Sequence, residues 1–375
     1  MNPAIDFGET LLNTLMANEG NLPRQFLGDE LFPKLLARTL TLPPEPPGHL
    51  ELLNEINSET TVAERILLYS FLAKVWSGKG NVLEIGPFLG GTTRAMALGM
   101  LQNPKRDPRA RLYTYDKFEK YYNSEQLLSA LDHLFRKGRL PEEAKDQISR
   151  SDNFLEVFQL LHKDQEYYPL IRPKVGVLPG TKDEVGKLER IFALDKGQEF
   201  DIIFVDGCKG WYPTKYFMLE VAAHTEPGTY FIFQDYGWYT CFWIAAFVEI
   251  MSHCFDFITN VDDIHVFKLE QNLTTPEIEA AFPDTPQELG ADCLDAMFDG
   301  LSQRALELDD MRGYFQHQLH RVSSLAYLGI KSEALRILRG LLDFPYFKSR
   351  EDYLAVINTA VRVPAYTPEG NVHFH

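Results

Sequence analysis

The sequence predicts an α/β protein, in which a Rossmann-like, doubly wound sheet of seven strands, the last one antiparallel, is covered by helices. Three observations support this fold class. Short apolar runs recur along the middle of the chain, helical stretches separate them, and a glycine-rich turn follows the first run. Apolar strands that alternate with helices indicate a parallel sheet that is buried on both faces.

The expected strands are short. In chain order they are Val82–Ile85, Arg111–Tyr115, Lys174–Leu178, Asp201–Val205 and Thr229–Phe233. The helices expected between them lie at 93–101, 182–195, 212–223 and 239–253. Two further apolar runs, Phe255–Ile258 and His265–Leu269, have no helix between them, so we expect an antiparallel hairpin at one edge of the sheet.

Three regions are expected along the chain. Residues 1–60 form a helical N-terminal cap that ends in a joint with four prolines, Leu42–Gly48, which cannot be helical. Residues 61–270 hold the sheet, with a long insertion at 117–173 that is either a lid or a structural elaboration. Residues 271–375 form a helical extension, in which Tyr314–Leu342 is typical of a helical hairpin.

The composition argues against a nucleic-acid-binding, secreted or membrane protein. The 375 residues are enough for about two to three domains. The 37 Lys and Arg residues against 53 Asp and Glu residues give a net charge of −16, which repels nucleic acid. The four cysteines have no metal-ligand spacing, and neither a secretory leader nor a membrane-spanning run is visible, so we expect a cytoplasmic protein without membrane contact.

The glycine-rich turn lies at the end of the first strand. Its spacing, Gly86-x-x-x-Gly90-Gly91, differs from both the dinucleotide fingerprint and the phosphate loop. Glu84 in the preceding strand is suited to bind an ammonium group. Asp116 ends the second strand, where an acid can hold two ribose hydroxyls. An amino-acid head and a ribose without phosphate describe S-adenosylmethionine, so a small-molecule cofactor of this type is predicted.

A family resemblance supports the same cofactor. Val82–Gly86 with Gly90-Gly91-Thr92 resembles motif I of class I S-adenosylmethionine-dependent methyltransferases, and Tyr115–Glu119 is similar to a stretch of the macrocin O-methyltransferase group. Later parallels are Phe204–Asp206, Tyr212–Lys215, Pro227-Gly228 and Asp235-Tyr236. The resemblance as a whole covers about 61–270.

The resemblance implies O-methylation of a hydroxyl on a small natural product or glycoside. The cofactor site that it implies comprises Glu84, Gly86, Pro87, Phe88, Gly90, Gly91, Thr92, Asp116, Lys117, Phe118, Gly180, Thr181 and Asp206. The helical N- or C-terminal regions are expected to support a homo-oligomer.

The candidate catalytic residues are Asp206, Lys209 and Asp235, at the ends of the fourth and fifth strands. In the macrocin-like group the matching positions are carboxylates that bind a divalent metal, usually Mg²⁺. Here Gln234 replaces one acid, and Cys208-Lys209-Gly210 stands where another is expected. One alternative is Mg²⁺ bound by Asp206, Gln234 and Asp235. The other, which we favour, is a site without metal that works by simple positioning or through Lys209, with Asp206 or Lys209 taking the proton or stabilising the developing alkoxide.

Two other functions stay open at this stage. A methyltransferase-fold protein that lost turnover and serves as a binding or scaffold protein is consistent with the changed carboxylates at Gln234 and Cys208. A nicotinamide oxidoreductase is disfavoured because its glycine spacing is absent.

Overall fold

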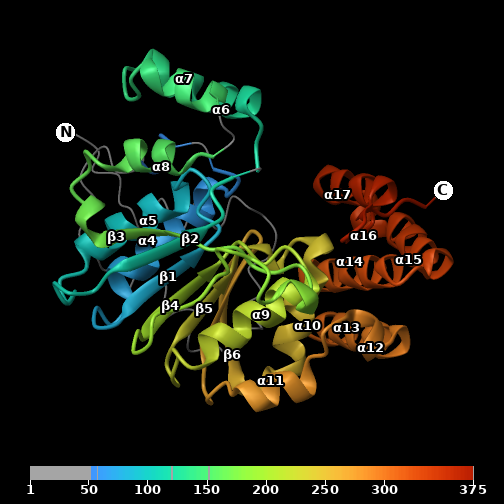
Figure 1. The fold of residues 1–375 in the computed structure, drawn as a ribbon. Helices are drawn as coiled ribbons and strands as arrows, with labels where there is room; N and C mark the ends of the chain where they lie inside the picture. The colour runs from blue at the N-terminus through green and yellow to red at the C-terminus, as the bar shows by residue number, and fades with distance from the viewer. Residues whose placement is uncertain (1–51, 57, 120, 151–152, 375) are drawn as a thin grey trace, which may run out of the picture.

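The computed structural model describes residues 52–374 apart from 57, 120 and 151–152. The proline-rich joint and nearly all of the predicted N-terminal cap therefore lie outside the described residues. A seven-stranded sheet in the order β3-β2-β1-β4-β5-β7-β6 forms the centre of the molecule (Figure 1). Its strands are β1 Asn81–Ile85, β2 Leu112–Asp116, β3 Ile171–Val175, β4 Phe200–Val205, β5 Tyr230–Phe233, β6 Phe255–Val261 and β7 Ile264–Leu269.

The strand directions confirm the predicted topology. Strands β3, β2, β1, β4 and β5 pair in parallel, and β7 pairs antiparallel with β5, with Phe231 opposite Phe267. Strand β6 pairs with β7 as the expected hairpin. The chain order reverses direction between β1 and β4, and this is where open α/β sheets bind their ligands.

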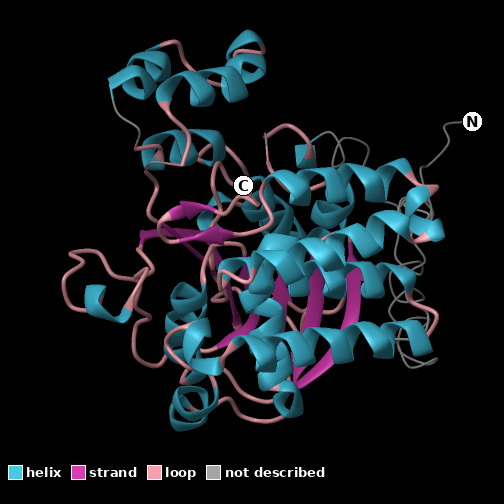
Figure 2. Cartoon of the chain, turned by 90° about the vertical axis from the view of Figure 1, so that its right-hand side faces the viewer, coloured by secondary structure: helices cyan, strands magenta, loops and turns pink. Residues whose placement is uncertain are grey.

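Each face of the sheet supports a separate hydrophobic core, because successive side chains of a strand point to opposite faces. Val82 packs with helices α4 (Val62–Lys74) and α5 (Gly91–Gln102), whereas Leu83 packs with α9 (Trp211–Ala222) and α10 (Phe242–Ile250). Figure 2 shows the sheet with helices on both sides. This double coverage explains why strands such as β4 and β5 are mostly apolar.

Two sequence predictions are wrong for β3 and the segment that follows it. The third strand begins and ends three residues earlier than expected, because Val175 pairs with Asp116 at the end of β2. Its Pro173 is tolerated since β3 lies at the edge of the sheet. No helix spans 182–195, where the structure describes only a short 3-10 turn at Lys182–Glu184. Residues around Ile191 instead run beside Val177, and Phe192 is fully buried.

The insertion after β2 contains three helices, α6 (Ser124–Arg136), α7 (Glu143–Arg150) and α8 (Leu155–His162). Helices α6 and α7 stand away from the sheet, above α8, in Figure 1. Glu55 ties this region to the body, since its carboxylate forms ion pairs with Arg94 at 2.7 Å and Arg139 at 2.9 Å.

The C-terminal extension is mostly helical, as predicted. Its helices are α11 Thr275–Ala281, α12 Pro286–Leu289, α13 Ala291–Glu307, α14 Met311–Tyr327, α15 Lys331–Asp343, α16 Pro345–Lys348 and α17 Glu351–Arg362. The predicted hairpin is α14–α15, and Gly329 with φ +83° lies in its turn. A two-stranded ribbon, β8 Tyr366–Thr367 with β9 Gly370–Asn371, follows α17. Among the described helices, none combines the length and apolar character needed to cross a bilayer.

Candidate active site

A cavity of about 280 Å³ lies at the carboxyl ends of β1, β2, β3 and β4, at the point where the strand order reverses. The cavity is lined by Ser58, Glu59, Ile85, Gly86, Pro87, Phe88, Thr92, Tyr115, Asp116, Lys117, Tyr121, Gly176, Val177, Leu178, Asp206, Gly207, Lys209 and Pro213. Seven of the predicted cofactor residues are in this set, namely Gly86, Pro87, Phe88, Thr92, Asp116, Lys117 and Asp206.

The turn after β1 requires glycine at its first position. Gly86 has φ +86°, and a Cβ atom there would lie 2.7 Å from the main-chain carbon of Asp206. The close approach is fixed by two main-chain hydrogen bonds, from the Gly86 amide to the Tyr115 carbonyl and from the Asp206 amide to the Ile85 carbonyl, both 2.9 Å long. The ends of β1, β2 and β4 are therefore held together around the cavity.

The other two glycines of the turn do not line the cavity. Gly90, with φ +90°, precedes α5, and a Cβ there would lie 2.1 Å from Nε2 of the buried His162. A Cβ at Gly91 would lie 2.6 Å from the Ser58 side chain. Both positions need glycine for packing of α5 against neighbouring segments.

Glu84 lies beneath the glycine turn and does not line the cavity. Its carboxylate is fully buried and accepts hydrogen bonds from the hydroxyl groups of Thr92 and Thr93, each 2.6 Å long. Burial raises the pKa of Glu84 to about 7, although these hydrogen bonds act in the opposite direction. The structure thus places this side chain as a support for the turn, without the direct access to a ligand ammonium group that the sequence predicts.

Asp116 ends β2, and its side chain lines the cavity. Its Oδ1 accepts a hydrogen bond from the Phe118 amide at 2.8 Å, which fixes the carboxylate at the strand end. Burial raises the pKa of Asp116. Phe118 itself is fully buried, with φ +54°, and belongs to the hydrophobic core.

Gly180 and Thr181 are exposed and lie outside the cavity lining. The Gly180 amide donates a hydrogen bond to Glu184 at 2.7 Å. Because β3 ends three residues earlier than predicted, Val177 and Leu178 occupy the cavity wall instead.

Asp206, Lys209 and Asp235 lie together at the ends of β4 and β5. The Lys209 ammonium donates a hydrogen bond to Oδ1 of Asp206 at 2.9 Å and a second one to Oδ2 of Asp235. Burial raises the pKa of Asp206 to about 7, with Lys209 lowering it and Asp235 raising it. For Lys209, the two carboxylates outweigh the effect of burial and hold the pKa well above its usual value. The ammonium group stays charged between the two acids.

Gln234 points away from this group of three residues. Its Nε2 lies 3.5 Å and 3.4 Å from the carboxylate oxygens of Glu64 on α4. The same carboxylate accepts hydrogen bonds from the main-chain amides of Thr61 at 2.7 Å and Asp263 at 3.1 Å. An amide at position 234 can donate to Glu64, whereas an ionised carboxylate there has no donor. The amide that departs from the macrocin-like pattern therefore has a structural role in this chain.

The raised pKa of Glu64 leads to a prediction about how the stability of the fold depends on pH. Burial, with the nearby Asp263 and Asp262 charges, raises its pKa to about 8 in the folded protein. The folded state therefore binds a proton between about pH 4.5 and 8 that the unfolded state releases, and the free energy of unfolding falls as the pH rises through this window. In the Glu64→Gln variant, the free energy of unfolding should fall less over this pH window. The difference from the wild type should be on the order of a few kcal/mol.

Urea unfolding at several pH values tests this prediction. Glu143→Gln, on the exposed surface of α7, is the matched control and should keep the wild-type profile. An unchanged slope between pH 5 and 8 in Glu64→Gln would contradict the assignment.

One wall of the cavity is acidic and aromatic, and the sequence does not predict it. Glu59, before α4, accepts hydrogen bonds from the hydroxyl groups of Tyr121 and of Tyr122, the latter at 2.8 Å. Phe88, with φ +49°, packs edge-on against Tyr121 with ring centroids 5.1 Å apart. Burial and Glu59 raise the pKa of Tyr121, so its hydroxyl stays protonated. The only hint in the sequence is the Tyr121-Tyr122 pair soon after Asp116.

Two features decide the fold: the strand order, with β7 antiparallel between β5 and β6, and the glycine turn after β1. The chain has the Rossmann-like, doubly wound fold that the sequence predicts. No protein-family model matches the chain, and a search of curated proteins finds no match.

A search of solved structures finds matches at low identity and low TM-score. A candidate O-methyltransferase from Klebsiella pneumoniae is 14% identical, with a TM-score of 0.36, over 70% of this chain and 99% of that one. The Podospora anserina methyltransferase PaMTH1, solved with S-adenosylhomocysteine, is 12% identical, with a TM-score of 0.34, over 60% and 89%. The TDP-rhamnose 3'-O-methyltransferase CalS11 of calicheamicin biosynthesis is 13% identical, with a TM-score of 0.36, over 64% and 93%.

Proposed function

We propose that this chain is an S-adenosylmethionine-dependent O-methyltransferase that acts on a hydroxyl of a small natural product or glycoside and needs no metal. The observation that carries the proposal is the Lys209 ammonium between Asp206 and Asp235, at the rim of a cavity at the ligand-binding edge of the sheet.

The donor set of the cavity fits the cofactor. Gly86 brings the β1 turn within contact distance of the main chain after β4, so that main-chain groups border the cavity. Asp116 offers a carboxylate for the two ribose hydroxyls. Val177 and Leu178 provide apolar surface for the purine ring.

The carboxylate pair does not fit Mg²⁺. The Lys209 ammonium donates to both carboxylates, and Gln234 is directed to Glu64. An ammonium group at hydrogen-bond distance from both acids supplies the positive charge that keeps the carboxylates together. We therefore derive no step through a metal ion.

In the proposed reaction, bound cofactor supplies a methyl group on a sulfonium sulfur. The acceptor oxygen forms a new bond to the methyl carbon while the carbon–sulfur bond breaks. Asp206 takes the hydroxyl proton, since it lines the cavity and its raised pKa favours uptake of a proton. Lys209 stabilises the negative charge that develops on the oxygen. The products are a methyl ether and S-adenosylhomocysteine, and Asp206 releases its proton to water.

Cofactor binding gives a direct test. Asp116→Ala should weaken S-adenosylhomocysteine binding by about 1.5–3 kcal/mol, because it removes hydrogen bonds to a charged group. Calorimetric titration measures this change, and Asp164→Ala, at an exposed position of the insertion, is the control. Equal affinity in Asp116→Ala would contradict the ribose assignment. Tight NAD binding without S-adenosylhomocysteine binding would contradict the proposed function as a whole.

A further inference from the structure

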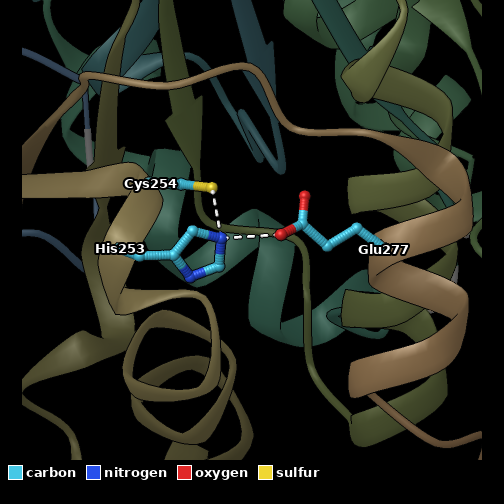
Figure 3. Close-up of side chains that lie close together, drawn as sticks. All are labelled: His253, Cys254 and Glu277. Carbon is cyan, nitrogen blue, oxygen red and sulfur yellow. Dashed lines mark hydrogen bonds and ion pairs between the residues drawn. The ribbon is translucent and has the colours of Figure 1, made fainter.

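A second cluster of reactive side chains lies between the sheet and the C-terminal extension. His253 and Cys254 belong to the 3-10 turn Ser252–Cys254 before β6, and Glu277 lies on α11. Figure 3 shows their side chains converging from the two elements. Nε2 of His253 is 2.7 Å from Oε1 of Glu277 and 3.3 Å from Sγ of Cys254. The three ligand atoms lie within 4.8 Å of one another.

The arrangement is unsuited to nucleophilic catalysis by the thiol. In a nucleophile–base–acid relay, the nucleophile and the orienting acid contact opposite nitrogens of the imidazole ring. Here the thiol and the carboxylate both contact Nε2 of His253. The ring nitrogen, the sulfur and the carboxylate oxygen therefore surround one point, as the ligand atoms of a bound cation do.

We propose that His253, Cys254 and Glu277 bind a Zn²⁺ ion. Imidazole nitrogen, thiolate sulfur and carboxylate oxygen are the ligand types that Zn²⁺ takes in proteins, and the thiolate disfavours Mg²⁺ and Ca²⁺. A thiolate and a carboxylate also balance the two positive charges of the ion. Zinc bonds of about 2.0–2.3 Å require only small movements of these side chains.

One side of the cluster faces solvent and the other faces the protein. His253 and Glu277 are 48% and 38% exposed, so an ion has a route of entry and water can provide the fourth ligand. Cys254 is buried, and its thiol lies 3.9 Å from the Asn272 carbonyl, to which the S–H donates. On metal binding the thiol proton leaves to solvent. The ion would then clamp α11, the first helix of the extension, to the start of β6.

Metal titration of the purified full chain, reduced and freed of metal with a chelator, tests the proposal. Zn²⁺ is expected to bind with one equivalent per chain and to raise the melting temperature by several degrees. Co²⁺ in its place is expected to give a sulfur-to-cobalt charge-transfer band. Cys254→Ser should lose this band and the thermal shift.

Three further variants complete the test. Glu277→Gln changes a partly exposed residue of α11, so it should fold normally and weaken Zn²⁺ binding at least tenfold. Glu279→Gln on the same helix and Cys293→Ser, which removes an exposed thiol elsewhere, should bind Zn²⁺ as the wild type does. Failure of the wild type to bind one equivalent would overturn the proposal. So would a bound equivalent that survives in both Cys254→Ser and Glu277→Gln. Since the readouts are metal binding and stability, they are independent of methyl transfer.

Discussion

Lys209→Met is expected to reduce methyl transfer by about two to three orders of magnitude while leaving S-adenosylhomocysteine binding nearly unchanged. The loss follows from removing a preorganised charge beside the reacting oxygen, and single-donor deletions of this kind have effects of about 10²–10³. In the variant, Asp206 and Asp235 face each other without an intervening cation, so one of them must take a proton.

The assay uses isotope-labelled cofactor and a library of hydroxylated metabolites and glycosides, with mass-spectrometric detection of methylated product. Lys187→Met, in the exposed loop after β3, is the matched control and should keep full activity. A parallel series contains excess chelator, in which the wild type should remain fully active. Loss of wild-type activity in chelator and its recovery with Mg²⁺ would show that Lys209 does not replace a metal.

Gly86→Ala is expected to abolish S-adenosylhomocysteine binding and to destabilise the fold strongly. A left-handed backbone conformation costs a non-glycine residue about 1–2 kcal/mol. At Gly86 the new Cβ would in addition lie 2.7 Å from the Asp206 main chain, which cannot move without disturbing β4. The total expected loss is several kcal/mol in the free energy of unfolding.

Gly138→Ala separates these two contributions. Gly138 also has a positive φ, of +65°, but a Cβ there would meet no atom within 4 Å. This variant should therefore show the conformational cost alone, with a melting temperature a few degrees below the wild type. Equal melting temperatures for the two variants would mean that the β1 turn relaxes without penalty.

The sheet could be predicted from the sequence because most of its strands are buried on both faces. Val82–Ile85 and Asp201–Val205 are apolar runs that only a covered parallel sheet explains. Strand β3 was misplaced because it lies at the edge, where Arg172 and Pro173 are tolerated and no apolar run marks it.

The candidate site likewise contains residues that could be predicted from the sequence and residues that could not. Asp116 and Asp206 could be predicted, because the ends of parallel strands meet at one edge of the sheet. The partner of Gln234 could not, since Glu64 lies 170 residues earlier in the chain and only the packing of α4 brings the two together. Glu59 was missed for the same reason, because its contacts with Tyr121 and Tyr122 join segments that no local pattern connects.

The C-terminal helices also limit how far the sheet can be treated as an independent unit. The segment that carries Asp235 continues into Tyr236, whose carbonyl accepts a hydrogen bond from Gln316 of α14 at 3.0 Å. Three residues further on, the Tyr239 hydroxyl donates to the Val363 carbonyl beyond α17 at 2.8 Å. The position of Asp235 thus depends partly on residues about eighty or more positions away in the chain. Transplanting the sheet alone into a chimeric enzyme would leave this carboxylate without its outer scaffold.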